Sequence, residues 1–470
     1  MNIKHSEIEI NSENPFANCK LDRQKYAQVL TDIIDSYADG FVLAINNKWG
    51  TGKTTFVKMW EQELKNKKYQ TVYFNAWEND FENNPLTALM GELKTLTTQV
   101  TEREFKLTLK KAATLTKHIA PIVAQTVAER YINTEGIKDA IVGVTKGLSD
   151  VFENDVNEYS KKKKGISEFR ESLSKFIADT NKGKPVVFII DELDRCRPNY
   201  AVSILEQIKH FFSVPNIVFV LSIDKKQLGN AIRGVYGSDK IDADEYLRRF
   251  IDIEYSIPEP ESDLFYNYLY DYFGFDEFLN SPERIEHSEL QQDKERFLLI
   301  CKLLFTNSAI PLRQQEKIFA LARISLRTFN ENSYVVPSIY LFLIFLKVVH
   351  SEFYENLEHK QLTMPQLQES FLKTIKHNKN ENTERELMWL EAYLLLYYNN
   401  YLTPRYYRKK IYERDTETGK NKLLITSVIN KNEEIKFLKI FEHMDYLGNM
   451  GDLNLGYFFS KINLLQKLHI

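Results

Sequence analysis

Short apolar runs followed by polar residues recur through the first half of the chain. They occupy residues 41–45, 185–190 and 217–221, and two further strand-like stretches span 71–78 and 251–258. Continuous apolar runs of this length are typical of strands that are buried on both faces of a parallel sheet. Between them, apolar residues recur three and four positions apart, which predicts helices, among them one with Asp22 as its N-cap. This half therefore predicts an α/β fold with a parallel sheet flanked by helices.

After residue 259 the strand-like runs fade and helical spacing dominates, with buried helices expected over 340–349 and 387–398. A chain of 470 residues exceeds the ~150 residues of a typical domain, so more than one domain is expected. We predict an α/β core over 1–260 with a helical insertion at about 85–177. A helical lid over 261–335 and a mostly α-helical C-terminal domain of unknown role over 336–470 complete the predicted organisation.

Composition limits the class of protein. With 43% hydrophobic and 27% charged residues the chain is globular, and its net charge of −3 gives no overall attraction to nucleic acid or to an anionic membrane. Its three cysteines are scattered, as in a reduced compartment, and the polar N-terminus lacks the apolar stretch of a signal peptide. No stretch reaches the ~20 apolar residues of a membrane span, so we expect a soluble, cytoplasmic protein.

The first apolar run leads into a glycine loop, residues 47–55, and then into helical spacing. This is the context of a phosphate-binding P-loop, in which backbone N–H groups and the helix N-terminus face phosphate oxygens, although Gly-Lys-Thr alone also fits an ordinary loop. Lys53 is expected to reach the β- and γ-phosphates, and Thr54 to bind Mg²⁺. Asn47 replaces the first glycine of G-x-x-x-x-G-K-T, and asparagine tolerates left-handed backbone. The candidate nucleotide contacts in the loop are Asn47, Trp49, Gly50, Thr51, Gly52, Lys53, Thr54 and Thr55.

The apolar run at 185–190 ends in Asp191 and Glu192, the pattern of a Walker B strand. Asp191 is expected to hold Mg²⁺ together with Thr54, and Glu192 to polarise the water that attacks the γ-phosphate. An acidic loop after a strand is the alternative, which the preceding P-loop weakens.

Polar residues at the ends of two other strands are candidates for the same ligand crevice. Ser222 and Asp224 follow the run at 217–221 and compete for a position beside the γ-phosphate or the attacking water. Asn75 and Glu78 end the 71–78 stretch, where a simple turn is the alternative.

Arginines are the candidates for stabilising the charge that develops on the γ-phosphate. Arg248 and Arg249 precede the last strand, and each is a candidate arginine finger in cis or in trans. The equal alternative is that both are surface residues paired with acidic neighbours. Arg313 lies in the first turn of a predicted helix, where the dipole disfavours a cation, so it is a candidate sensor. The sequence leaves open which of the three is the finger or the sensor.

Residues 401–414 interleave five basic residues with aromatic ones. This pattern suits single-stranded nucleic acid, whose bases stack on aromatic rings and whose phosphates pair with cations. An exposed edge or a surface for a protein partner is the more common meaning of such a stretch, and both interpretations stay open.

Together these residues resemble the KAP family of P-loop NTPases, a bacterial group with animal members that is related to the STAND and AAA-like ATPases. The matching stretches are 48–55, 74–77, 191–196, 219–228, 246–250 and 311–313. The resemblance implies binding of ATP and Mg²⁺ with slow hydrolysis, and it implies that Asp194 and Arg195 are active-site or coupling residues. Many bacterial relatives carry paired membrane spans before the Walker B strand, and this chain resembles a soluble member.

The main hypothesis is an ATPase that works as a conformational switch in bacterial anti-phage defence, a setting that comes from the resemblance, with a protein partner or as a homo-oligomer. Two alternatives stay open: a nucleic-acid-stimulated motor or loader, and a scaffold that binds nucleotide only for stability. The sequence does not separate ATP from GTP, and it does not identify the trigger.

Overall fold

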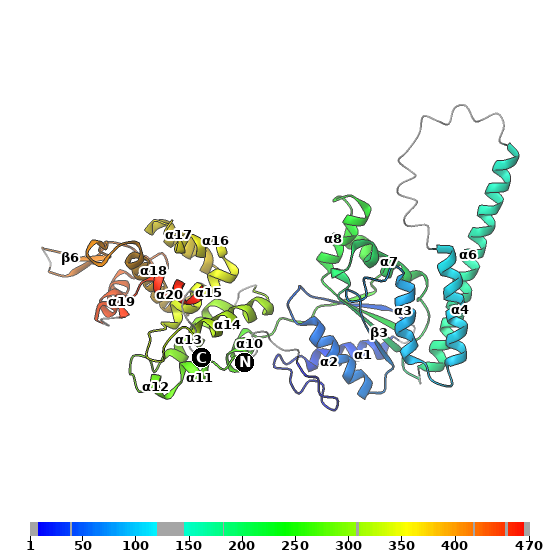
Figure 1. Ribbon diagram of the computed structural model, residues 1–470, viewed down its shortest axis with the longest axis horizontal. Helices are drawn as coiled ribbons and strands as arrows, with labels where there is room; N and C mark the ends of the chain where they lie inside the picture. The colour runs from blue at the N-terminus through cyan, green and yellow to red at the C-terminus, as the bar shows by residue number, and fades with distance from the viewer. Residues whose placement is uncertain are drawn as a thin grey trace. The chain divides into compact units, whose positions relative to one another are not determined.

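The computed structural model describes residues 8–37, 40–119, 145–181, 183–306, 310–416, 419–446 and 450–464. They fall into two compact units, Ile8–Pro258 and Glu259–Ile470 (Figure 1). The further division of the second unit into a lid and a C-terminal domain stays a prediction.

The first unit is built on a parallel sheet of five strands in the order β2-β3-β4-β1-β5, which confirms the predicted fold class. The strands are β1 (Val42–Asn46), β2 (Thr71–Asn75), β3 (Val186–Asp191), β4 (Ile217–Ile223) and β5 (Ile253–Tyr255). Strand β4 lies between β1 and β3, so Ser222 has Ile45 as its Cα partner on one side and Asp191 on the other. Parallel strands end at the same edge, and the polar residues that end β1, β3 and β4 therefore meet there.

Side chains alternate between the two faces of these strands and form two hydrophobic cores. Val187 and Val220 pack with α1 and α2 on one face, whereas Phe188 and Leu221 pack with α3, α4, α6, α7, α8 and α9 on the other. The helices of the unit are α1 (Gln24–Ser36), α2 (Lys53–Asn66), α3 (Pro85–Leu93), α4 (Glu102–Ile119), α6 (Thr145–Thr180), α7 (Pro198–His210), α8 (Lys225–Tyr236) and α9 (Ala243–Leu247), with 3₁₀ turns η1 (Lys94–Leu96) and η2 (Leu193–Arg195).

The predicted insertion at 85–177 is helical in its described part, where α4 and α6 run side by side (Figure 1). A hydrogen bond between the hydroxyls of Thr108 and Ser172 (2.9 Å) joins these helices. Residues 120–144 of the insertion lie outside the described residues. The predicted cap of the first helix is wrong: α1 begins at Gln24, and Asp22 has φ of 48° and pairs with Lys25 instead.

The second unit is mostly helical, as predicted from its sequence pattern, and it is organised around the buried helix α15. Its helices are α10 (Ser262–Tyr272), α11 (Asp276–Leu279), α12 (Pro282–Ile285), α13 (Asp293–Phe305), α14 (Leu312–Leu326), α15 (Pro337–Val349), α16 (Ser351–Glu358), α17 (Met364–Ile375), α18 (Glu384–Leu402), α19 (Glu434–Tyr446) and α20 (Leu455–Ile462), with a 3₁₀ turn η3 (Arg405–Tyr407). An antiparallel hairpin that the sequence did not predict joins β6 (Tyr412–Arg414) to β7 (Asn421–Leu423). Among the described helices of the chain, none combines the length and the apolar character needed to cross a bilayer.

Candidate functional site

The glycine loop joins β1 to α2 at the carboxyl edge of the sheet. Gly50 and Gly52 have φ of 78° and 80°, a left-handed conformation that strains residues with a Cβ. Gly52 is the N-cap of α2 and has no side chain that could cap this helix. The N–H groups of the first turn and the positive end of the helix dipole are therefore left for an anion, in the arrangement expected of a P-loop.

Asn47 does not adopt the left-handed backbone that the sequence analysis considered, and its place among the nucleotide contacts stays a prediction. Its φ is not positive, because the left-handed positions of the loop fall on Gly50 and Gly52. Its side-chain amide forms two hydrogen bonds with the backbone of Ile257, accepting from the N–H (2.9 Å) and donating to the carbonyl oxygen (2.8 Å). Ile257 is the next-to-last residue of the first unit. The residue that replaces the glycine thus fastens the P-loop to the segment that leaves the unit.

Lys53 lies in the first turn of α2 and is only 8% exposed. Its ammonium donates to the carbonyl oxygens of Asn47 and Lys48. Burial lowers the pKa of Lys53, while the nearby carboxylates of three aspartates, Asp194, Asp224 and Asp191, act in the opposite direction. One ammonium among three carboxylates leaves local negative charge, which suits a divalent cation at this edge of the sheet.

Asp191 ends β3 and is 1% exposed. One of its carboxylate oxygens accepts from the Tyr73 hydroxyl (3.0 Å) and the other from the Glu192 N–H (2.9 Å). Beside it on β4, the Ser222 hydroxyl is fully buried and finds no hydrogen-bond partner within the described residues. A buried hydroxyl without a partner is unfavourable, so this position is suited to a ligand or to a water that a ligand orders.

Glu192 has φ of 60°, a strained conformation that is found at functional sites. Its carboxylate pairs with Arg195 Nη1 (2.7 Å) and accepts from the Asn75 amide (3.4 Å). Burial raises the pKa of Glu192, and the charge of Arg195 partly offsets this effect. A carboxylate with a raised pKa that two neighbours hold in place has the properties of a general base.

Trp49 connects the P-loop to the stretch that follows β3. Its indole N–H donates to the Asp194 carboxylate, and its backbone N–H donates to Asp224 Oδ2 (3.3 Å). Burial raises the pKa of Asp194, which the hydrogen bond from Trp49 opposes. Asp224 also caps α8 by accepting from the Gln227 N–H (3.3 Å). Both oxygens of Asp224 are therefore engaged in holding the fold, which distinguishes it from Ser222.

Arg23 is a residue of this site that the sequence analysis missed. It is 4% exposed, and its Nη1 donates to the carbonyl oxygen of Gly52 (3.3 Å). In the described part of the chain its Nε lacks a hydrogen-bond partner and no carboxylate pairs with it, while burial lowers its pKa. A buried cation without a counter-ion is unfavourable unless an anion binds beside it. The one sequence signal was a basic residue at a helix start, where the dipole disfavours it.

The structure does not bring Arg249 to this edge of the sheet. Arg249 lines a cavity of about 450 Å³ together with Val42, Ile217 and Asp252, which lie at the amino ends of strands. The length of β1, roughly 13 Å at ~3.3 Å per residue, separates that end from the P-loop. A cis role for Arg249 at its own P-loop therefore does not fit, and a contact in trans stays a prediction. Arg313 lies in the first turn of α14 in the second unit, and its role also stays a prediction.

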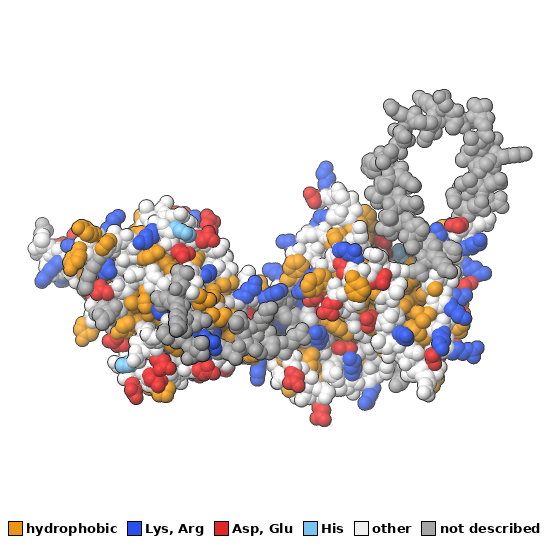
Figure 2. Space-filling model, viewed as in Figure 1, with side chains coloured by type: hydrophobic (Ala, Val, Ile, Leu, Met, Phe, Trp, Pro, Cys, Tyr) orange, Lys and Arg blue, Asp and Glu red, His pale blue; other side chains and the backbone are white. Residues whose placement is uncertain are grey.

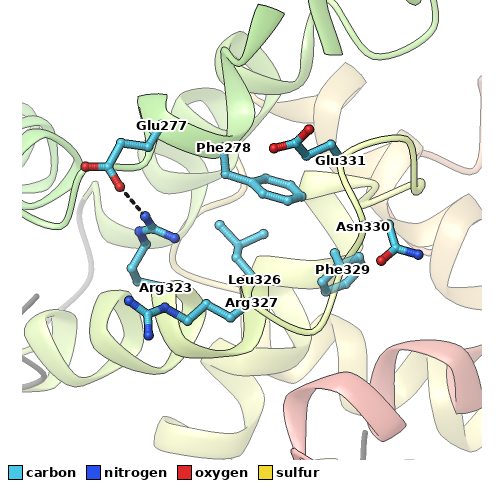
Figure 3. Close-up of a pocket in the computed structure, with 8 residues that line it drawn as sticks. All are labelled: Glu277, Phe278, Arg323, Leu326, Arg327, Phe329, Asn330 and Glu331. Carbon is cyan, nitrogen blue, oxygen red and sulfur yellow. Dashed lines mark hydrogen bonds and ion pairs between the residues drawn. The ribbon is translucent and has the colours of Figure 1, made fainter. Parts of the chain in front are cut away.

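The second unit contains a separate hollow of about 490 Å³ beside α11 and α14 (Figure 3). Phe278, Leu326 and Phe329 form its apolar side, and Arg323 pairs with Glu277 (2.6 Å) at its rim. Arg323 also donates to the Phe273 carbonyl oxygen (2.9 Å), so its guanidinium is engaged in holding α10, α11 and α14 together. These contacts account for the hollow as part of the packing of the unit.

The family comparison agrees with this geometry. The profile of the KAP family P-loop domain matches residues 23–413. A stretch of 177 residues is 27% identical to an uncharacterized protein of Methanocaldococcus jannaschii, over 32% of this chain and 89% of that protein. The solved structure of the Aeropyrum pernix ORC2 protein aligns with 90% of this chain and 95% of its own at 12% identity, with a TM-score of 0.32. Because the family profile spans most of the sequence, including both the glycine loop and the acidic strand end, the chain belongs to the KAP family of P-loop NTPases.

Proposed function

We propose that this chain is a Mg²⁺-dependent ATPase that works as a conformational switch. The observation that carries the proposal is the convergence of Lys53, Asp191 and Glu192 at one edge of the sheet, with Ser222 on β4 between β1, which leads into the glycine loop, and β3. Triphosphate hydrolysis needs an anion cradle, a metal-holding carboxylate and a base for water, and these residues supply the three.

The phosphates would lie on the N–H groups of residues 50–55, and the Lys53 ammonium would exchange the carbonyls of Asn47 and Lys48 for phosphate oxygens. Thr54 and Asp191 would hold Mg²⁺, which when bound neutralises phosphate charge. The buried carboxylates around Lys53 fit this group, as does the Ser222 hydroxyl, which has no partner in the part of the chain that the structure describes.

Glu192 would accept the proton of the attacking water. Arg195 and Asn75 keep its carboxylate at the mouth of the site, and its raised pKa makes it a stronger base than an exposed glutamate. Ser222 is favoured over Asp224 as the polar group near the γ-phosphate, because Asp224 already caps α8 and holds Trp49. The finger or sensor arginine would come from Arg313 or, in trans, from Arg248 or Arg249.

The switch would begin at Asn47. Its carbonyl oxygen accepts from Lys53, and its side chain holds Ile257 at the end of the unit. If a bound phosphate draws the Lys53 ammonium away, the Asn47 carbonyl oxygen loses this hydrogen bond. Asn47 holds Ile257, so the change reaches the last residues of the unit, which we call the exit segment. Nucleotide would then shift the populations of the exit segment by as much as it prefers one of its conformations.

The test is steady-state hydrolysis of ATP and GTP by wild type, Lys53→Ala and Glu192→Gln, with nucleotide affinity measured in parallel. We expect Glu192→Gln to lower turnover by about 100-fold or more while it retains binding, as for loss of a general base. Lys53→Ala should lose binding and turnover together, and Lys65→Ala on the exposed side of the same helix should change neither. Unchanged turnover in Glu192→Gln would refute Glu192 as the general base. Nucleotide binding without turnover in the wild type would refute the ATPase and favour the scaffold that binds nucleotide only for stability.

The setting we propose, bacterial anti-phage defence with a protein partner or as a homo-oligomer, rests on the family resemblance. Size measurement with and without ATP tests the oligomer, since a trans role for Arg249 requires a second copy of the chain.

A further inference from the structure

Two consecutive tyrosines stand almost free of the protein surface next to a pair of lysines. Tyr406 is 94% exposed and Tyr407 is 78% exposed, and Lys409 and Lys410 are also exposed. We refer to residues 406–410 as the tyrosine–lysine ridge. In the described part of the chain, no ion pair or side-chain hydrogen bond engages these four residues. Their rings and ammonium groups are therefore available to a ligand.

The ridge is held firmly by the residues around it. The buried Asn399 donates from its amide to the Lys409 carbonyl oxygen (2.7 Å), and Arg408, between the tyrosines and the lysines, pairs with Asp452 (2.9 Å). Ile411, which follows the ridge, is 6% exposed and anchors it to the core. A segment fixed on both sides that still directs two aromatic rings outward is a preformed surface, for which ligand binding needs little further ordering.

The charge around the ridge is opposite in sign to that of the whole chain. Residues 405–422 contain seven Lys and Arg against three Asp and Glu, whereas the chain carries a net charge of −3. Hydrophobic and basic side chains adjoin at this end of the second unit, where β6 lies (Figures 1 and 2). Asp452, Asp445 and Glu442 contact this segment and offset part of that excess. Lys409 and Lys410 pair with no carboxylate of the described residues, and their charge favours an anionic partner.

We propose that the tyrosine–lysine ridge binds single-stranded nucleic acid. Flat, exposed rings stack on unpaired bases, and the neighbouring ammonium groups pair with phosphates along the strand. A duplex hides the base faces that the rings would contact. A protein partner fits less well, because lysine is depleted from the centres of protein interfaces. This inference is independent of nucleotide hydrolysis, since the ridge lies in the second unit and uses none of the residues of the P-loop site.

The test measures fluorescence anisotropy of the full-length protein with labelled oligothymidylate and oligouridylate of about 20 nucleotides, longer than the ~4–16 nucleotides of known single-strand sites. Tyr406→Ala with Tyr407→Ala should weaken binding about tenfold or more, whereas the two Tyr→Phe changes should preserve it because phenylalanine also stacks. Lys409→Gln with Lys410→Gln should reduce the slope of log affinity against log salt by about 1.4, at ~0.7 per phosphate contact.

Matched controls are Tyr37→Ala and Lys161→Gln with Lys163→Gln, which change exposed residues of the first unit and should leave binding unaltered. Thermal unfolding and ATP turnover of each variant verify that the fold is retained. The proposal is overturned if the wild type binds neither oligonucleotide at low salt, or if the alanine variants bind as the wild type does. It is also overturned if a duplex of about 20 base pairs binds more tightly than the single strands. Capture of anionic vesicles in place of oligonucleotide would reassign the ridge to a lipid surface.

Discussion

The side chain of Asn47 bonds to both backbone polar groups of Ile257, donating to its carbonyl oxygen at 2.8 Å and accepting from its N–H at 2.9 Å. An asparagine amide presents a donor and an acceptor side by side, so it can pair with an extended residue much as a neighbouring strand does. The contact explains why a residue other than glycine stands at the first position of this P-loop.

Asn47→Gly restores the common P-loop residue and removes both hydrogen bonds to Ile257. We expect nucleotide affinity to stay within about threefold of wild type, because the phosphate contacts come from the N–H groups of later loop residues. The difference should appear in the hydrogen exchange of residues 253–262, measured in Glu192→Gln so that bound ATP is not hydrolysed. ATP should protect these residues when Asn47 is present, and this protection should disappear when Asn47→Gly is added. Protection that persists in Asn47→Gly would show that Asn47 does not connect the nucleotide site to residues 253–262.

Arg23→Gln removes the buried cation beside Gly52. Because the guanidinium has no carboxylate partner among the described residues, we expect nucleotide to supply its counter-charge. The variant should bind a fluorescent ADP analogue about tenfold more weakly, which corresponds to ~1.4 kcal/mol. Lys25→Gln is the control, since Lys25 follows Arg23 by two residues and forms a surface ion pair with Asp22. Equal affinity in both variants would assign Arg23 to the packing of the loop.

Trp49→Phe keeps the aromatic ring and removes the indole N–H that donates to Asp194. The buried Asp194 carboxylate would lose a donor, at a cost of about 1–3 kcal/mol, and the P-loop would lose its attachment to the stretch after β3. We expect weaker nucleotide binding and a lower melting temperature. Asp194→Asn retains an acceptor for the indole N–H, so it should lower the melting temperature less than Trp49→Phe does.

The acid limb of the kcat/KM profile should report Glu192. Burial raises its pKa and Arg195 lowers it, so activity falls as pH drops through a value above that of an exposed glutamate. Arg195→Met removes the lowering charge, and the limb should move to higher pH. The residual activity of Glu192→Gln should lack this limb. An acid limb that stays in place in Arg195→Met would contradict the pairing of the two residues as the cause.

Asp293→Ala leaves Arg284 as a fully buried cation. The two side chains are 3% and 0% exposed, and Arg284 also donates to the carbonyl oxygens of Glu331 and Ser333. Breaking a buried pair costs about 3–5 kcal/mol, which urea unfolding should detect. The neighbouring Lys294→Gln breaks a surface pair with Asp276 and should change stability by less than about 1 kcal/mol. Similar losses in the two variants would argue against the buried pair as the stronger contact.

Local sequence pattern was sufficient for the fold class and for bringing the candidates Lys53, Asp191 and Glu192 to one edge of the sheet, while their catalytic roles stay predictions. A continuous apolar run such as residues 185–190 has few alternatives to a strand buried on both faces, and the glycines before Lys53 indicate a phosphate loop once the acidic end of that strand is taken with them. The polar ends of β1, β3 and β4 follow, because parallel strands carry their ends to one edge. These features depend on residues close together in the chain, where spacing alone carries the information.

What the tertiary structure decided depends on residues far apart in the chain. Asn47 meets Ile257 across 210 positions, Trp49 meets Asp194 across 145, and Arg23 reaches Gly52 from the N-cap position of α1. Packing likewise separates Ser222, whose buried hydroxyl has no partner among the described residues, from Asp224, whose oxygens hold the loop and α8. The fold also places Arg249 beside the amino ends of the strands, at the opposite edge of the sheet. Spacing along the chain does not encode these pairings, because each one forms only when the packing of the sheet and helices brings its partners together.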